Sequence, residues 1–191
     1  MQFFTLITAA LTLVAGAAAE ITCENRKTLS TSQIGESKNV QLQHVHCSNP
    51  IKPTGEDIQL RDVEFLGKRQ TNVCGATCTT NCFTPSGGGP NPYDCQVIQD
   101  ALLYDSQNVG PLFDMDPSNN TSLIVMQYAS CETFIVNQTN RTLEYCRSDW
   151  ASLTEYIAFN CQSTQNAHGG NCVASDQQWF VQYVSFLSPP P

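Results

Sequence analysis

The sequence predicts an α+β fold: a small disulfide-rich two-layer sandwich, with two helices on a mainly antiparallel sheet. Three observations support this prediction. They are two apolar stripes of helical period, four segments of strand character between and after them, and ten cysteines in 191 residues. Strands that alternate with only two helices are typical of domains in which helices cover one face of an antiparallel sheet.

The N-terminus has the composition of a secretory signal. Residues 3–14 are apolar and the small residues Ala17, Ala18 and Ala19 follow, so we expect residues 1–19 to be a signal peptide cleaved after Ala19. The apolar run is shorter than the roughly 20 residues of a membrane-spanning helix, and no other segment comes close. We therefore expect a secreted, extracellular protein that is not an integral membrane protein.

Charge and cysteine content change at the dibasic pair Lys68–Arg69. Residues 20–69 carry seven basic and seven acidic side chains, whereas residues 70–191 carry two basic and ten acidic ones, a net charge of −8. This boundary predicts a propeptide over 20–69, ending in the dibasic site, and a mature cysteine-rich domain over 70–191. An uncleaved N-terminal extension is the alternative.

The cysteines divide evenly at the same boundary. Cys23 and Cys47 precede it, and eight follow it, so each side can close its own bridges. In an oxidising compartment we expect all eight to form disulfides, with a pairing that the sequence does not define. Zinc at the first three is the weaker alternative, because no histidine lies nearby and no C-x2-C pair exists. The eight are Cys74, Cys78, Cys82, Cys95, Cys131, Cys146, Cys161 and Cys172.

Two helices are predicted in the mature region. The first begins at Pro92, with Asn91 as its cap, and runs to about Ser106. The second begins at Ser148–Asp149, a second capping signature. Each carries an apolar stripe of helical spacing, which is typical of a core face. The stripes are Cys95, Ile98 and Leu102 in the first, and Trp150, Leu153, Ile157 and Cys161 in the second.

The strands are predicted where the apolar period changes to two, or where apolar, β-branched and aromatic residues run together. Between two of them, the turn-like residues 137–140 predict a hairpin. Residues 84–92, rich in glycine and proline, are expected to be an irregular connector. The four predicted strands are 122–128, 132–136, 142–146 and 178–186.

Four N-glycosylation sequons lie in predicted turns or loops of the mature region. If two or three of them carry glycans, that edge of the sheet is covered and is not the partner-binding face. The acceptor residues are Asn119, Asn120, Asn137 and Asn140.

From Asp94 onward the chain resembles the Ecp2-like necrosis-inducing domains of secreted fungal effectors, which are related to the KP4 killer toxin. The resemblance covers about 90 residues; the cysteines at 74, 78, 82, 146 and 161 lie outside the shared pattern. It implies an α/β sandwich that binds host or competitor cells, or is toxic to them, without catalysis. The matching stretches are residues 94–98, 130–134, 148–149, 169–172 and 179–181.

The sequence holds no strong catalytic motif and no phosphate-binding glycine loop. A nuclease is one enzymatic alternative, with His168 as general acid, Glu132 or Glu144 as base, and Arg141 or Arg147 holding phosphate. The net charge of −8 argues against it, because it repels nucleic acid.

Other site chemistries have weaker support. A glycosidase would need two carboxylates at a defined separation across a cleft, and no motif pairs them. A calcium site over residues 114–119 lacks the glycine and distal glutamate of a calcium-binding loop. Trp150 and Trp179 lie in core patterns rather than in a sugar platform. We expect no cofactor and no metal ion.

The function that this pattern favours is a secreted, non-enzymatic effector or killer-toxin-like glycoprotein, fungal in origin, that acts by binding at a cell surface. Its acidic mature domain favours a cationic or protein partner over nucleic acid or anionic membrane. We expect it to be a monomer. Two alternatives remain: a secreted hydrolase, either nuclease or glycosidase, and a structural glycoprotein associated with the cell wall.

Overall fold

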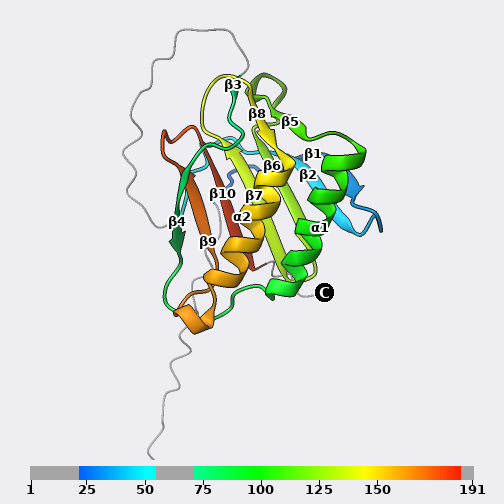
Figure 1. The fold of residues 1–191 in the computed structure, drawn as a ribbon. Helices are drawn as coiled ribbons and strands as arrows, with labels where there is room; N and C mark the ends of the chain where they lie inside the picture. Colours follow the sequence, from blue (N-terminus) through cyan, green and yellow to red (C-terminus); the bar gives the residue numbers. More distant parts are fainter. Residues whose placement is uncertain (1–21, 55–70, 186–191) are drawn as a thin grey trace, which may run out of the picture.

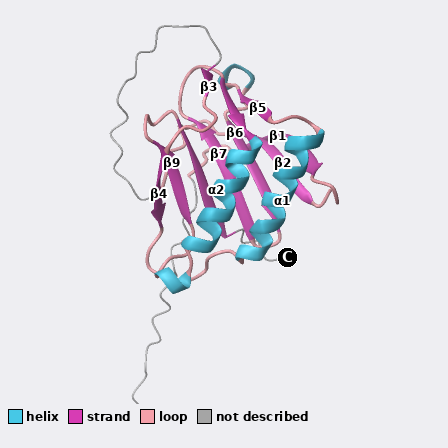
Figure 2. Ribbon diagram, viewed as in Figure 1, coloured by secondary structure: helices cyan, strands magenta, loops and turns pink. Residues whose placement is uncertain are grey.

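The computed structural model describes residues 22–54 and 71–185. Two helices cover one face of a seven-stranded sheet, beside a smaller three-stranded sheet (Figure 1, Figure 2). The order of the large sheet is β1-β2-β6-β7-β10-β9-β4, and all neighbouring strands are antiparallel. The predicted α+β class is therefore confirmed. Its strands are β1 (Lys27–Ile34), β2 (Val40–His46), β4 (Cys78–Cys82), β6 (Leu123–Tyr128), β7 (Cys131–Asn137), β9 (Gly170–Ala174) and β10 (Trp179–Ser185).

The small sheet consists of β3 (Thr71–Asn72), β8 (Leu143–Cys146) and β5 (Leu112–Met115), with β8 in the centre. The predicted hairpin at residues 137–140 is wrong, because β7 and β8 belong to different sheets. Asn137 explains the divergence. Its amide nitrogen donates to the carbonyls of Met115, at 2.9 Å, and Arg141, at 2.7 Å, and so ties the turn to β5.

The first helix, α1 (Pro92–Asn108), begins where the sequence predicted. The Asn91 side chain accepts a hydrogen bond from the backbone N–H of Tyr93 at 3.0 Å, which satisfies one of the free donors at the helix start. The predicted stripe is buried against the sheet. Its fully buried members are Cys95, Ile98 and Leu102.

The second helix, α2 (Arg147–Asn160), begins one residue before the predicted cap and has no side-chain capping bond. Instead, Asp149 in its first turn accepts a hydrogen bond from Gly75 N–H at 2.6 Å. Trp150 is fully buried and donates its indole N–H to Thr133 on β7 at 3.1 Å. Trp179 is fully buried as well, so both tryptophans have the expected core role. Neither described helix is long and apolar enough to cross a membrane.

Strand alternation divides the apolar residues between the two faces of the large sheet. On β7, Ile135 points to the helices and joins the main core, whereas Phe134 and Val136 point to the other face. That outer face has its own buried cluster, which contains no helix residue. The cluster consists of Val45, Ile51, Leu123, Val125, Phe134, Val136, Val173 and Phe180.

Residues 22–54 belong to the same sheet, although the sequence assigned them to a propeptide. β1 and β2 form the edge opposite β4 (Figure 1), and β2 pairs with β6 over residues 41–45. β1 is exposed along most of its length, so its sequence lacks the apolar alternation that predicts a strand. Ala19, Lys68 and Arg69 lie outside the described residues, and cleavage at these positions stays a prediction.

The strand pair β1–β2 contains a histidine that should make it sensitive to acid. Burial lowers the pKa of His44 below its ordinary value of 6.5, and its Nδ1 lies 2.9 Å from Ser30 Oγ. Below about pH 6.5, the ordinary pKa of histidine, His44 binds a proton in the unfolded chain but not in the folded protein. The free energy of unfolding therefore decreases as the pH falls from about 6.5 through the lower pKa of the folded state.

We therefore expect the melting temperature to fall between pH 7.5 and pH 5, and His44→Gln to reduce that fall. Thermal unfolding of both proteins at the two pH values tests this. An equal fall in both proteins would assign the acid sensitivity to other groups.

Candidate binding surface

His168 orients a loop. It follows the short helix η2 (Ser163–Gln165), and its Nδ1 lies 2.6 Å from the carbonyl of Pro85. A carbonyl only accepts, so Nδ1 carries the proton in this contact. The ring also packs against Phe83, with centroids 6.1 Å apart. Within residues 22–54 and 71–185, His168 forms no hydrogen bond or ion pair with a carboxylate or guanidinium.

The other residues of the nuclease hypothesis lie on separate elements, each engaged in a hydrogen bond of its own. Glu132 is buried on β7 and accepts from Gln127, and Glu144 on β8 accepts from Asn72 at 2.6 Å. The arginines are engaged as well. Arg147 donates to the carbonyls of Gly110, at 2.6 Å, and Leu112, whereas Arg141 donates to the Gln178 side chain at 2.6 Å.

The acidic loop at residues 114–119 is held by its own hydrogen bonds. Asp116 caps the short helix η1 (Pro117–Asn119): it accepts from Ser118 N–H at 2.9 Å, Ser118 Oγ at 2.8 Å and Asn119 Nδ2 at 2.6 Å. The bonds from Ser118, first that of its side chain, lower the pKa of Asp116. In this structure the Asp116 carboxylate caps η1, whereas the calcium alternative would use its oxygens as metal ligands.

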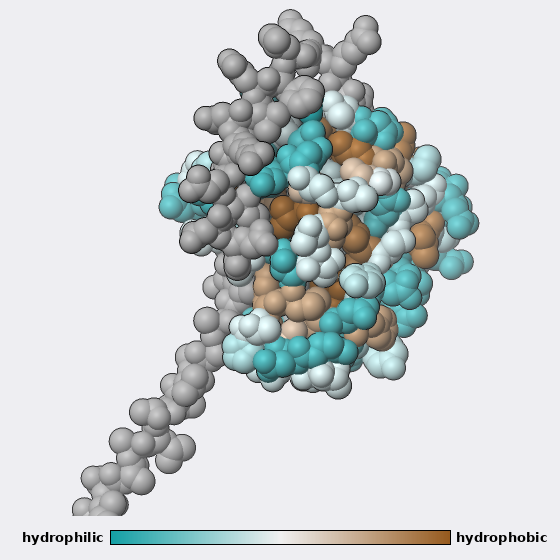
Figure 3. All heavy atoms as spheres, turned by 60° about the vertical axis from the view of Figure 1, so that its left-hand side comes forward, coloured by the Kyte–Doolittle hydropathy of each residue, from teal (hydrophilic) through white to brown (hydrophobic). Residues whose placement is uncertain are grey.

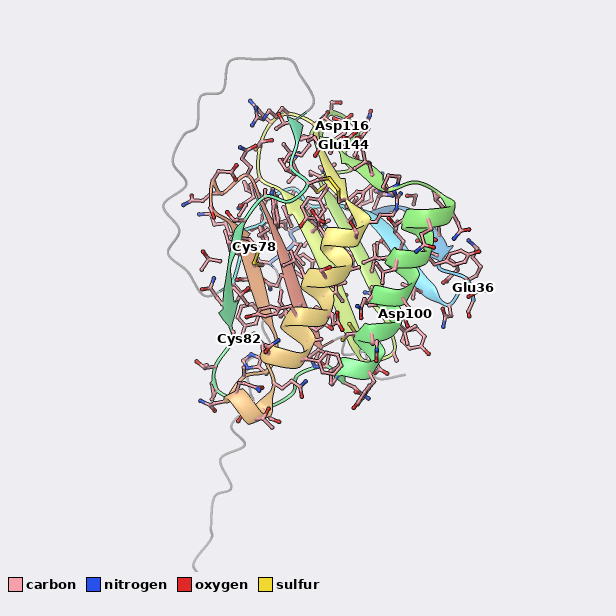
Figure 4. The ribbon with its side chains drawn as sticks, viewed as in Figure 1. Glu36, Cys78, Cys82, Asp100, Asp116 and Glu144 are labelled. Carbon is pink, nitrogen blue, oxygen red and sulfur yellow. A yellow bond between two sulfur atoms is a disulfide. The ribbon has the colours of Figure 1, made fainter. Side chains whose placement is uncertain are left out.

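The structure does pair two carboxylates that sequence reasoning missed. Asp114 on β5 lies directly opposite Glu144 on β8, and Figure 4 shows Glu144 and Asp116 at the same end of the molecule. Strand register creates this pair, and no spacing in the sequence signals it. Both residues sit on the small sheet, and neither lines the two pockets described below.

Four disulfides are present. Cys23–Cys47 closes the N-terminal segment, and three bridges join β4 and its approach to the rest of the domain. Cys78 and Cys82, four residues apart on β4 (Figure 4), bond to Cys172 and Cys161, while Cys74 bonds to Cys146. The three cysteines that were considered as zinc ligands, Cys74, Cys78 and Cys82, are therefore all in disulfides. The one grouping of metal-ligand types among the described residues, Cys74, Cys146 and Asp149, also contains a bridge.

Cys95 and Cys131 are free thiols, which differs from the expectation that all eight mature cysteines are bridged. Both are fully buried between α1 and β7. Cys131 Sγ lies 3.4 Å from Tyr183 Oη, and Cys95 Sγ lies 3.2 Å from the carbonyl of Asn91. Burial, together with the neighbouring Cys95, raises the pKa of Cys131, so this thiol stays protonated and unreactive at neutral pH.

The four sequons lie in two loops at one end of the molecule, but they differ in access. Asn119, Asn120 and Asn140 are exposed. Asn137 is buried, and both hydrogens of its amide nitrogen are donated to carbonyls. A glycan on that buried nitrogen would replace one of the two hydrogens and remove its hydrogen bond, so the fold accommodates glycans on the other three sequons only.

Two pockets are lined by described residues. One, of about 300 Å³, lies between residues 45–51 and the sequon loops, and the other, of about 290 Å³, lies under residues 87–92. His46 and Tyr183 are their only titratable lining residues. Tyr183 is fully buried, and burial raises its pKa above the ordinary value.

Three of the aromatic residues on the two helices form what we call the aromatic patch: Tyr93, Tyr156 and Phe159. Tyr93 and Tyr156 are 67% and 53% exposed. The Tyr93 ring packs edge-on against Phe159, with centroids 5.9 Å apart, and Tyr156 lies one turn before Phe159 on α2. On the face shown in Figure 3, apolar residues form several small areas separated by polar ones.

Two acidic side chains lie on the same helices as the aromatic patch. Glu155, beside Tyr156, accepts from Gln99 on α1 at 2.8 Å, and so links the two helices. Asp100 lies exposed on α1 (Figure 4). An aromatic centre with an acidic border is complementary to a partner that presents lysine or arginine, because a cation is attracted both to the carboxylates and to the ring faces.

The two free thiols predict a specific alkylation pattern. Without reductant, the native protein should incorporate no alkylating reagent, and the denatured protein should incorporate two equivalents, at Cys95 and Cys131. Mass spectrometry with peptide mapping measures this, and a fully reduced sample provides the control. Denatured protein that takes up no reagent would mean that these two cysteines form a fifth bridge.

The sequon geometry predicts which asparagines carry glycans. Enzymatic deglycosylation in oxygen-18 water converts each glycosylated asparagine to an isotope-labelled aspartate. It should label Asn140 and at least one of Asn119 and Asn120, and leave Asn137 unlabelled. A marked Asn137 in folded, secreted protein would contradict the prediction.

A matched pair of variants tests the structural role of the same residue. Asn137→Asp replaces two buried donors with an acceptor and should lower the free energy of unfolding by on the order of 2 kcal/mol. The exposed Asn140→Asp should leave it within about 0.5 kcal/mol. Both are measured on deglycosylated protein by chemical denaturation.

Comparison with known proteins leaves the family open: no protein-family model matches the chain, and no curated protein matches it. The resemblance to Ecp2-like domains therefore rests on the short sequence motifs alone. Four disulfides are typical of a small secreted cysteine-rich protein, and this coarser class is what the structure supports.

Proposed function

We propose that this protein is a secreted, non-enzymatic, cysteine-rich effector or killer-toxin-like glycoprotein that acts by binding at the surface of a host or competitor cell. The disulfide content supports secretion, and the motif resemblance supports the effector class. The observation that carries the proposal is the aromatic patch on the helix layer, with Tyr93 and Tyr156 exposed beside acidic residues.

Exposed tyrosines supply much of the binding energy in many protein interfaces, because a rigid aromatic ring buries a large area at low entropic cost. Two tyrosines that are more than half exposed, one of them held by Phe159, form such an anchor. The net charge of −8 draws a cationic partner toward this surface. We therefore propose a partner that presents basic residues, and a working surface on α1 and α2.

The positions of the sequons support the same surface. Asn140 lies between β7 and β8, and α2 begins directly after β8. Tyr156 and Phe159 lie in the last turns of α2, about 15 Å further along a helix that rises 1.5 Å per residue. Glycans on Asn119, Asn120 or Asn140 would therefore leave the aromatic patch uncovered.

Substitution of the patch tests the proposal. The double variant Tyr93→Ala/Tyr156→Ala should reduce binding of fluorescently labelled protein to target cells at least tenfold, since each tyrosine is expected to contribute more than about 1 kcal/mol. Val109→Ala, at the other end of α1 and also 67% exposed, is the matched control and should bind like the wild type. Equal binding by all three proteins would exclude this surface.

His168→Ala, assayed with a panel of polysaccharide and nucleic-acid substrates, tests the hydrolase alternative. A general acid contributes about 10² to 10⁴ in rate, so its loss would be plain in a turnover assay. We expect no turnover by the wild type and a change in biological potency below tenfold. The structural alternative is tested by abundance. A structural wall protein would show constant abundance in the wall fraction, whereas the proposed effector would be secreted in response to contact with another organism.

A further inference from the structure

We propose that residues 22–54 remain bound to residues 71–185 without a covalent link after the chain is cut at Lys68–Arg69, so that the processed protein consists of two chains. This inference does not depend on the proposed binding activity. It follows from how much of the sheet and of both cores the N-terminal segment supplies.

The first contact is the strand ladder between β2 and β6. Five residue pairs are in register, from Gln41 opposite Gln127 to Val45 opposite Leu123. β6 pairs with β7 on its other side. Without β2, the backbone N–H and C=O groups along one side of β6 would be left at an open sheet edge, which favours aggregation.

The second contact is on the outer face of the sheet. Val45 and Ile51 of the N-terminal segment are buried against residues of β6, β7, β9 and β10, all of which lie in the other part of the chain. Phe134, Val125 and Phe180 have no exposed surface. Because the helices cover only the inner face, removal of the segment would uncover part of this apolar cluster.

The third contact is polar and specific. Thr54 N–H donates to Gln182 Oε1 at 3.0 Å, and Gln182 Nε2 donates to Thr54 Oγ1 at 2.8 Å. Asn171 Nδ2 donates to the carbonyl of Thr54 at 2.9 Å. Gln182 and Asn171 are fully buried, so they would lose these partners if the segment left.

The turn between β1 and β2 packs against α1. Gly35 N–H donates to Asp105 Oδ1 at 3.2 Å. Gly35 has φ +82°, and a Cβ there would lie 2.7 Å from Ala101 Cβ, so the turn approaches the helix more closely than any other residue type allows. Ile34 and Val40, on either side of the turn, are part of the main core.

No covalent link supplements these contacts. All ten cysteines lie in the described residues: Cys23–Cys47 is internal to the N-terminal segment, and the other three bridges are internal to residues 71–185. The remaining cysteines, 95 and 131, are free and lie on the same side of the cut. A cut at Lys68–Arg69 therefore gives two separately bridged chains that are held by packing and hydrogen bonds.

The experiment is to cut the folded, full-length secreted protein with a dibasic-specific protease and to pass it through a native gel-filtration column. We expect both chains to co-elute at the volume of the uncut protein, whereas denaturing electrophoresis without reductant should separate them. Separate elution of the chains in native buffer would overturn the inference. If the dibasic pair resists the protease, a site-specific protease sequence in place of residues 67–70 provides the cut.

Variants identify the contacts that hold the chains together. Val45→Asp should raise the dissociation constant of the two cut chains at least tenfold over the wild type, because it places a charge in the outer cluster. Leu29→Asp, on the exposed strand β1, should behave like the wild type. Near-UV circular dichroism before cutting checks that each variant folds.

Hydrogen exchange provides a second readout that needs no variant. The β6 amides bonded to β2 should keep their protection in the cut wild-type protein. Loss of protection confined to β6 and the outer face would also overturn the inference.

Discussion

Both faces of the large sheet must be covered, and this constraint underlies the arrangement of the whole molecule. Strand alternation places apolar side chains on the inner and the outer face of β6, β7 and β10. The helices α1 and α2 protect the inner face, while Val45, Ile51 and the Cys23–Cys47 bridge lie against the outer one. A domain of residues 71–185 alone would leave part of the outer face of its sheet in water, which is unfavourable in proportion to the apolar area exposed.

The two edges of the sheet are secured by different means. At the β4 edge, Cys78–Cys172 joins neighbouring strands and Cys82–Cys161 joins the strand to the end of α2. The β1–β2 edge is held by the β6 ladder, the outer cluster and the hydrogen bonds of Thr54. The aromatic patch lies on the helix layer between these edges. Tyr156 and Phe159 lie on α2, which is bridged at both ends by Cys74–Cys146 and Cys82–Cys161, whereas Tyr93 lies on α1, to which no bridge is attached.

Local patterns predicted the elements that have a local cause. Pro92 and Asn91 marked the start of α1, and apolar periodicity located both helices and the strands β6, β7, β8 and β10. β1 to β5 and β9 were missed. The residues of β1, β4 and β9 are polar or small, and these segments become strands only through pairing with distant segments. The carboxylate pair Asp114–Glu144 was missed for the same reason. Burial of Asn137 and the free state of Cys95 and Cys131 depend on tertiary packing, which sequon and cysteine counts do not contain.

The contact between Thr54 and Gln182 has a consequence for biosynthesis. These residues are 128 positions apart in the chain. Likewise, β2 cannot pair with β6 until β6 has been synthesised. During translation the N-terminal segment therefore emerges first and finds its partners only near the end. Contacts of such long sequence separation slow folding, since a large loop must close before they form. β10, the last of the described strands to be synthesised, completes the site at which Thr54 docks, so folding should require β10 rather than proceed from the N-terminus outward.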